Sequence, residues 1–191
     1  MLNFSLPEII SLVVVLLVAF PIHELAHALT ADYFGDDTPR LYGRITLNPF
    51  AHLDLFGSLL LILAGFGWAK PVPVNEYALA SRSRIAPALV ALAGPASNLA
   101  LGLISGFILA TGFVPVPSAP SRYIPSFYEV LYIFTVINFV LALFNLIPLF
   151  PLDGEKIAVR FLPPEWGDGL AKLRRFSFGP LIILILSLIH I

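Results

Sequence analysis

Long apolar runs separated by short polar stretches dominate the pattern of this chain. Residues 85–114 and 130–152 contain no charged side chain, and a third run, near the N-terminus, is equally long. A helix needs roughly 20 mainly apolar residues to cross about 30 Å of hydrocarbon, so runs of this length predict membrane-spanning helices. The predicted spans lie at about 8–31, 86–112, 127–150 and 176–191, the last of them short.

The region between the first two predicted spans has a different pattern. Its apolar run 55–69, LFGSLLLILAGFGWA, is short and contains three glycines, which favours a re-entrant or interfacial segment over a full crossing. Before it, LYGRITLNP mixes β-branched, aromatic and polar residues, and after it KPVPVN alternates prolines, so both stretches favour extended structure at the membrane surface.

These patterns together predict one fold class. We expect an all-α polytopic membrane protein with about four transmembrane helices, plus a membrane-associated β-strand or re-entrant region at about 40–75. Residues 1–191 are expected to form a single integral-membrane domain without a PDZ or CBS domain. We also expect the first apolar run to stay in the mature chain, because no small-residue cleavage site follows it.

Composition agrees with a membrane protein and excludes several other classes. Of the 191 residues, 58% are hydrophobic and only 12% are charged, about half the charge of an ordinary soluble domain. A solvated globule and a disordered tail are therefore excluded. The net charge of −1 gives no basic face for nucleic acid, so the expected partner is the lipid bilayer. The absence of cysteine excludes disulfides and thiolate zinc sites.

The basic residues predict how the chain is oriented. If 55–69 does not cross, ten of the 11 basic residues fall in the loops 32–84 and 151–175, and only Arg122 lies on the other side. Basic loops prefer the cytoplasm, which places the N-terminus outside and both of these loops inside. We expect the protein in the cell membrane.

Three ionisable residues, in the run HELAH, interrupt the first apolar segment. His23 and His27 are four residues apart, so they share one face of a helix and can point at a single ion, with Glu24 beside them. This spacing is typical of a zinc site in which the glutamate acts as general base. The alternative is a pair of interfacial histidines with an incidental carboxylate, although charged groups inside a span are costly and usually functional.

A catalytic zinc ion needs a third protein ligand, and Asp153 is the best candidate. It follows the uncharged run in NLIPLFPLDG, where two prolines break the helix and Gly154 permits a sharp turn. The alternative is that Asp153 caps the next helix. Asp153 and HELAH both lie near the end of their spans, so they meet only if the first and third spans run parallel. That requires 55–69 not to cross, which is the topology that the basic residues favour.

Several motifs in the chain resemble those of one known family. The chain resembles the intramembrane zinc metalloproteases of the site-2 protease type over about residues 19–156. The matching motifs are HELAH, TLNPFAHLDLFG, GFGWAKPVPVN, AGPASN at 93–98 and NLIPLFPLDG at 145–154. The combination of HELAH with the motif that ends in Asp153 and Gly154 is highly specific.

The resemblance implies that His23, His27 and Asp153 hold one Zn²⁺ and that Glu24 activates water. It implies an intramembrane endopeptidase that cuts peptide bonds in or near transmembrane segments of membrane-protein substrates. Two alternatives stay open: an ion or metal transporter that uses the same cluster, and an inactive binding protein of the same fold. A neutral amide could stabilise the oxyanion, with Asn145 the first candidate and Asn98 the second; a structural interhelical hydrogen bond is an equal alternative for each.

The remaining polar and glycine residues receive simpler interpretations. His52 and Asp54 could ligate metal, but surface anchoring is the preferred interpretation. The glycines of the second span are expected to allow close helix packing, and the basic cluster near the C-terminus is expected to mark a cytoplasmic loop. These are Gly94, Gly102, Gly106, Lys172, Arg174 and Arg175.

Overall fold

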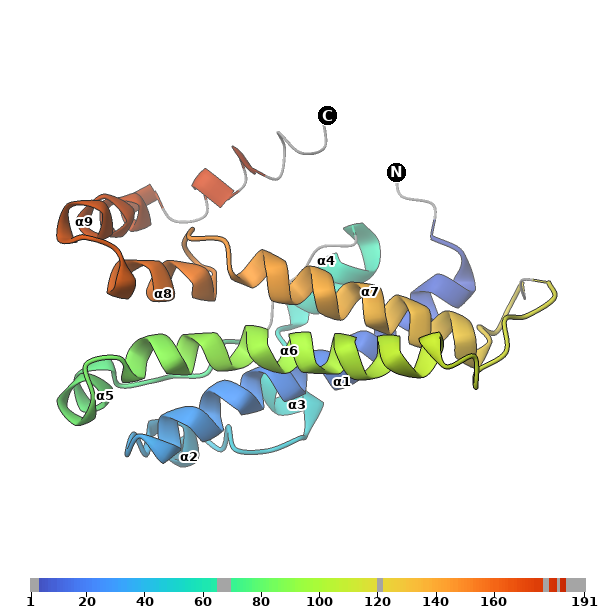
Figure 1. Cartoon of the computed structure of the whole chain (residues 1–191), viewed down its shortest axis with the longest axis horizontal. Coiled ribbons are helices and arrows are strands. Elements are labelled where there is room, and N and C mark those ends of the chain that lie inside the picture. The colour runs from blue at the N-terminus through green and yellow to red at the C-terminus, as the bar shows by residue number, and fades with distance from the viewer. Residues whose placement is uncertain (1–3, 65–69, 120–121, 177–178, 182, 185–191) are drawn as a thin grey trace.

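The computed structural model describes residues 4–64, 70–119, 122–176, 179–181 and 183–184, and within these ranges the regular elements are helices (Figure 1). No strand forms in the described part of the chain, so the helical class is confirmed and the expected sheet is not. In chain order the elements are α1 (Leu6–Tyr33), α2 (Thr38–Leu41), α3 (Pro49–His52), α4 (Leu55–Ala64), α5 (Glu76–Arg82), α6 (Ala86–Ala110), α7 (Phe127–Asn145), α8 (Asp153–Phe161), α9 (Pro164–Leu173) and η1 (Arg174–Phe176).

Three of the described helices, α1, α6 and α7, are long and apolar enough to cross a membrane. They contain 28, 25 and 19 residues, and even the shortest is roughly 28 Å long at 1.5 Å per residue. The third predicted span ends at Asn145 rather than at 150, because Pro148 and Pro151 cannot continue a helix. The predicted fourth span, 176–191, falls mostly outside the described residues.

The three long helices alternate in direction. In Figure 1, α1 and α7 run from right to left and α6 runs from left to right, with α6 packed against both of the others. The segment between α1 and α6 therefore begins and ends at one end of the bundle, and its α4 has only 10 residues, too few to cross as a helix. The parallel arrangement of the first and third spans agrees with the ligand argument above.

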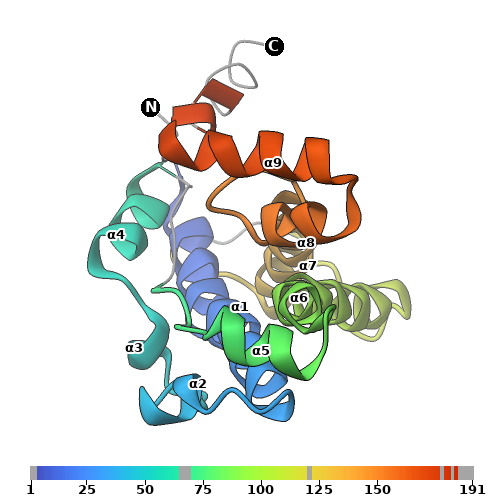
Figure 2. The ribbon, with the colours of Figure 1, turned by 90° about the vertical axis from the view of Figure 1, so that its left-hand side faces the viewer.

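The end of the bundle at the left of Figure 1 carries most of the short helices. Figure 2 looks at this end and shows α2 and α5 on one side of the long helices and α8 and α9 on the other. The loops 32–84 and 151–175 thus both begin at the same end of the molecule, where α1 and α7 finish, although α3 and α4 lie beside the middle of the long helices in Figure 1.

Serine caps begin the two helices that start at the opposite end. Ser5 N–H donates to the Glu8 carboxylate at the start of α1 (2.7 Å), and Ser126 N–H donates to Glu129 at the start of α7 (2.7 Å). Each glutamate follows its serine by three residues, which is the capping-box spacing. Both α1 and α7 therefore begin at a position that the local sequence defines.

The stretch expected to form strands folds instead into turns and two short helices. Gly43 has φ 66°, a left-handed turn conformation, and the Asn48 side chain caps α3 by accepting from Phe50 N–H (3.1 Å). The buried Arg44 guanidinium donates to the carbonyl of Ala51 (2.5 Å) and to that of Lys70 (3.4 Å). Side chains thus bind backbone groups that a sheet would have paired. In the described part of this region one backbone bond still joins the two sides of 55–69, from Lys70 N–H to the His52 carbonyl (2.7 Å), and residues 70–75 have no regular secondary structure.

The outer faces of the long helices are apolar and exposed. On α6, Leu103, Ile104 and Phe107 are 57–72% exposed, and on α7 Val140 and Leu143 are 51% and 68% exposed. A contiguous apolar surface of this kind is rare on soluble monomers but suits contact with lipid. The polar side chains of the same helices point inward and build the site.

Candidate metal centre

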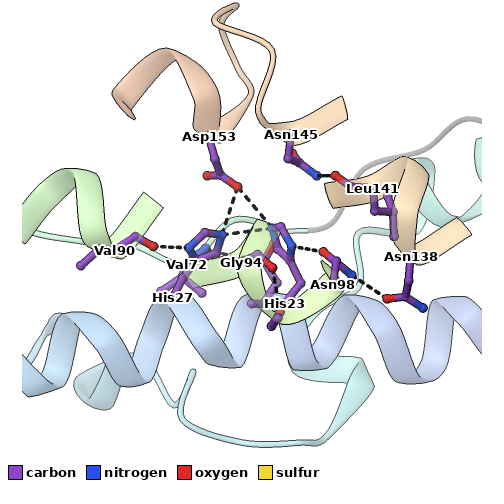
Figure 3. Close-up of polar contacts among 12 residues, drawn as sticks. His23, His27, Val72, Val90, Gly94, Asn98, Asn138, Leu141, Asn145 and Asp153 are labelled. Carbon is purple, nitrogen blue, oxygen red and sulfur yellow. Dashed lines mark hydrogen bonds and ion pairs between the residues drawn. The ribbon is translucent and has the colours of Figure 1, made fainter. Parts of the chain in front are cut away.

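Two helices bring His23, His27 and Asp153 together. The histidines lie one turn apart on α1, and Asp153 is the first residue of α8 (Figure 3). The two Nε2 atoms are 3.0 Å apart, and Asp153 Oδ2 lies 3.3 Å from Nε2 of His23 and 3.2 Å from Nε2 of His27. All three side chains are buried, with 6–9% of each residue exposed.

The size of this triangle fits a zinc ion. Bonds of about 2.0–2.1 Å in a tetrahedral site place neighbouring ligand atoms about 3.3 Å apart, close to the three separations here. Three protein ligands leave the fourth tetrahedral position for water, as catalytic zinc sites require. In the described part of the chain, His23, His27 and Asp153 form the group of His, Asp and Glu side chains that could hold a metal ion.

The other ring nitrogen of each histidine fixes its tautomer. His27 Nδ1 lies 2.7 Å from the carbonyl oxygen of Val90 on α6, and this oxygen can only accept. His27 Nδ1 therefore carries a hydrogen, and in the neutral ring Nε2 keeps its lone pair. Hydrogen bonding behind a metal-binding histidine orients the ring and raises its basicity.

His23 is held from behind by a chain of two asparagines. Its Nδ1 lies 2.5 Å from Oδ1 of Asn98 on α6, Asn98 Nδ2 donates to Oδ1 of Asn138 on α7 (2.9 Å), and Asn138 Nδ2 donates to the carbonyl of Phe134 (2.8 Å) (Figure 3). Both asparagines are completely buried. This chain gives His23 the same tautomer as His27.

Three electron pairs therefore converge on one point. With both Nδ1 atoms protonated, the two Nε2 lone pairs and an Asp153 oxygen face each other within 3.3 Å without a hydrogen between them. Such a cluster repels itself unless a cation is present, and burial strengthens the repulsion. The donor set thus fits a bound metal ion on its chemistry as well as on its distances.

Glu24 lies next to the first histidine and accepts a backbone hydrogen bond. The N–H of Val72 donates to Glu24 Oε2 (3.1 Å), and the carboxylate is 7% exposed. Val72 belongs to the extended segment 70–75, in which Pro71 and Pro73 have no N–H to offer. The segment therefore passes directly beside the carboxylate and orients it.

A cavity of about 900 Å³ gives access to these residues. His23, Glu24, His27 and Asp153 all line it, and most of the remaining wall is apolar. Such a wall suits a hydrophobic ligand bound to a few polar groups. Among the apolar residues of the wall are Phe20, Val72, Val74, Val90, Leu141 and Phe144.

Two glycines permit the close approaches on which the site depends. A Cβ added to Gly94 of α6 would lie 2.6 Å from Cε1 of His23 and closer still to the His27 ring. A Cβ added to Gly154 would overlap the backbone of Leu146 and Ile147. Gly94 therefore faces the histidines, beyond the general packing role expected of it, and Gly154 lets α8 begin against the turn after α7.

Of the other candidate residues, Asn145 lines the cavity, whereas Asn98, His52 and Asp54 do not. Asn145 lines the cavity and donates to the carbonyl of Leu141 (3.0 Å), whereas Asn98 lies behind His23 and does not contribute to the cavity wall. His52 Nε2 bonds the carbonyl of Thr46 (2.8 Å), and Asp54 accepts from Gly57 N–H at the start of α4 (2.9 Å). Neither His52 nor Asp54 belongs to the metal-binding group.

Sequence reasoning missed two partnerships around the site. Asn138 was not singled out, although an asparagine seven residues before Asn145 in an uncharged span is a signal for a polar helix face. Glu155 is 1% exposed and pairs with Arg174 (2.7 Å), which joins α8 to η1. The hydrogen bonds to Glu155 raise the pKa of Arg174. Arg174 thus has a specific partner besides marking a basic loop.

Comparison with known proteins places the chain in a family. The family model for peptidase family M50 matches residues 11–165. A relative from Bacillus subtilis (strain 168), "Putative zinc metalloprotease YwhC", is 45% identical over 179 residues, which are 92% of this chain and 78% of the relative.

Two mycobacterial relatives are more distant. Both are named "Putative zinc metalloprotease Rip2"; the protein of Mycolicibacterium smegmatis is 27% identical and that of Mycobacterium tuberculosis (strain H37Rv) is 29% identical over 177 residues. The match covers 90% of this chain but 64% of each of these relatives. No solved structure matches the chain. The chain belongs to peptidase family M50, the site-2 protease family of membrane zinc metalloproteases.

Proposed function

We propose that this protein is an intramembrane zinc endopeptidase that hydrolyses peptide bonds in or near transmembrane segments of membrane-protein substrates. One observation supports this most strongly: two imidazoles and a carboxylate from α1 and α8 converge beside Glu24 on the wall of a mainly apolar cavity. The combination supplies ligands, a base and a hydrophobic binding surface in one place.

In this proposal His23, His27 and Asp153 hold one Zn²⁺ per chain. A bound zinc ion would lower the pKa of its water towards about 7 and polarise the scissile carbonyl. The protein's own task is to keep the three ligand atoms in place. The Val90 carbonyl does so for His27 and Asn98 does so for His23.

Glu24 is the general base. Its carboxylate takes a proton from the attacking water and returns that proton to the leaving amine, a role that contributes typically 10²–10⁴-fold to a rate. The hydrogen bond from Val72 N–H holds Oε2 in place, and Oε1 is the oxygen we assign to the attacking water. The backbone at Val72 is thus part of what orients the base.

Asn145 is the residue we propose to stabilise the oxyanion. It lines the cavity, and its bond to the Leu141 carbonyl uses one of the two N–H groups of its amide. The second N–H can donate to the carbonyl oxygen of a substrate as negative charge develops there. Asn98 is less suited to this role, because it lies behind His23 and does not line the cavity.

The substrate must offer an extended stretch, because a helical peptide bond is shielded. Residues 70–75 are extended and reach both Glu24 and the cavity. We propose that the locally unwound substrate lies along this segment. Residues 42–48, which were also expected to be extended, form turns and bends and offer no strand edge.

The test is Glu24→Gln in the purified full chain, with zinc content and cleavage of a transmembrane peptide measured on the same sample. We expect zinc to stay at one per chain and cleavage to fall by about 10²–10⁴-fold. Glu8→Gln is the matched control, since it makes the same change at the far end of α1.

Three results would contradict the proposal. Cleavage retained in Glu24→Gln would show that another group is the base. Zinc transport into vesicles by a wild-type protein that cleaves nothing would favour a transporter. Zinc binding without either activity would favour an inactive binding protein of the same fold.

A further inference from the structure

The chain of hydrogen bonds behind His23 has a fixed direction. The Phe134 carbonyl can only accept, so the NH₂ group of Asn138 must face it and Asn138 Oδ1 must face Asn98. Asn98 then turns its own NH₂ towards Asn138 and its Oδ1 towards His23. A backbone carbonyl of α7 thus sets the orientation of two side chains and, through them, the hydrogen on His23 Nδ1.

The reversed chain is excluded by the same bonds. If Asn98 turned over, its NH₂ would face His23 Nδ1, which would favour the tautomer with hydrogen on Nε2, the atom that faces His27 and Asp153. Asn138 would then have to turn its oxygen towards the Phe134 oxygen, placing two acceptors against each other. Both asparagines are 0% exposed, so water cannot relieve that conflict.

We infer that Asn138 is a positioning residue for the metal centre: through Asn98 it keeps the Nε2 lone pair of His23 free for the metal, although it touches neither the histidine nor the ion. The inference rests on the zinc site of the proposed function. According to this inference, α7 contributes to metal affinity through Asn138, besides leading into the turn that positions Asp153.

A neighbouring pair of residues shows what a purely structural contact looks like. Thr135, three residues before Asn138 on α7, donates to Ser105 Oγ on α6 (2.8 Å). This buried bond joins the same two helices, but its donor and acceptor stand outside the chain of hydrogen bonds that reaches His23. Removing it should loosen the α6–α7 contact to an extent similar to the loss of Asn138 without changing the tautomer of His23.

The experiment measures zinc affinity by chelator competition on metal-free protein, with thermal unfolding of the same metal-free samples. We expect Asn98→Leu to weaken zinc binding about 10–100-fold and Asn138→Leu to weaken it about tenfold, the range known for groups behind metal ligands. Thr135→Val should stay within about twofold of wild type, although its unfolding temperature falls as far as that of Asn138→Leu.

A double-variant cycle separates orientation from packing. In Asn98→Leu the acceptor that faces His23 Nδ1 is gone, so Asn138 has no side chain left to orient towards the histidine. Adding Asn138→Leu to this already weakened background should then change zinc affinity less than about twofold. A packing role predicts instead that Asn138→Leu is equally harmful in both backgrounds. Asn138→Ala replaces Asn138→Leu throughout if the larger side chain prevents folding.

The outcomes distinguish the inference from the proposed function. A wild-type protein that binds no zinc would overturn both. A wild-type protein that binds zinc, together with an Asn138→Leu variant of unchanged affinity, would overturn the inference alone. Equal losses for Asn138→Leu and Thr135→Val would also overturn it.

Discussion

Gly94 is the residue of α6 that leaves room for both histidine rings. Since an added methyl group would overlap His27 and lie 2.6 Å from Cε1 of His23, Gly94→Ala must displace the rings. We predict that it lowers zinc affinity by at least about tenfold while the chain still folds. Gly102→Ala is the control, because its added Cβ would meet the Phe139 ring at 3.3 Å, away from the site.

Chelator competition on both glycine variants checks this prediction. Unchanged zinc affinity in Gly94→Ala would mean that the rings can move without cost. A similar loss in Gly102→Ala would mean that the α6–α7 contact as a whole, rather than the space at Gly94, controls the site.

The residues that could be predicted from the sequence are those whose geometry is local. A spacing of four on one helix places His23 and His27 together without knowledge of the fold, and Asp153 follows from its place at the end of a span. The role of Asn98 could not be decided from the sequence. Oxyanion stabilisation and a structural hydrogen bond between helices both require an amide side chain inside a span. The contact of Asn98 with His23 joins residues 75 positions apart, and no local pattern encodes that distance.

At the scale of elements, a buried carboxylate of α8 anchors this helix to η1. Glu155 is enclosed, and Arg174 forms two bonds to it, of 2.7 and 2.8 Å. We predict that Arg174→Gln destabilises the docking of α8 by about 1–2 kcal/mol, a value reduced from that of a fully buried pair because Arg174 is partly exposed.

Hydrogen exchange of residues 153–161 measures this effect. Amide exchange in α8 should rise by about 5- to 30-fold in Arg174→Gln, which is the free-energy change expressed as a ratio. Arg175→Gln is the matched control, because this neighbouring guanidinium lies over the Phe176 ring instead. Equal exchange in the two variants would contradict the assigned role of the Glu155–Arg174 pair.

Apolar length made the long helices predictable, whereas the short elements depend on contacts that the pattern does not contain. The spans at α1, α6 and α7 were predicted within a few residues. The strands expected before and after 55–69 are not confirmed. Arg44 donates hydrogen bonds to backbone carbonyls on both sides of that run, at Ala51 and Lys70. β-branched and aromatic residues indicate a partly buried segment, but they do not require a strand. Here the segment forms turns and short helices.

At the scale of the whole molecule, the direction of the helices leads to a prediction about sidedness. The loops 32–84 and 151–175 both begin at one end of the bundle and carry ten of the 11 basic residues. We predict that this end faces the cytoplasm. The chain has no cysteine, so Glu76→Cys and Ser118→Cys each introduce a single labelling site, one at each end.

A membrane-impermeant maleimide applied to intact cells checks the orientation. Ser118→Cys should react from outside, and Glu76→Cys should react only after the membrane is opened. The reverse result would contradict the proposed orientation without affecting the metal centre. Labelling of both positions from outside would contradict the arrangement of the three described long helices.

The split origin of the ligands has a consequence for the architecture of the chain. Two ligand atoms come from α1 and the third from α8, more than a hundred residues later, so a metal ion bound there closes a very long loop. This chain has no disulfide bonds, and a bound metal ion would take the place of one. It would restrict the motion of chain segments far from the site itself. Occupancy of the centre would then determine how firmly α8 and α9 stay attached to the three long helices.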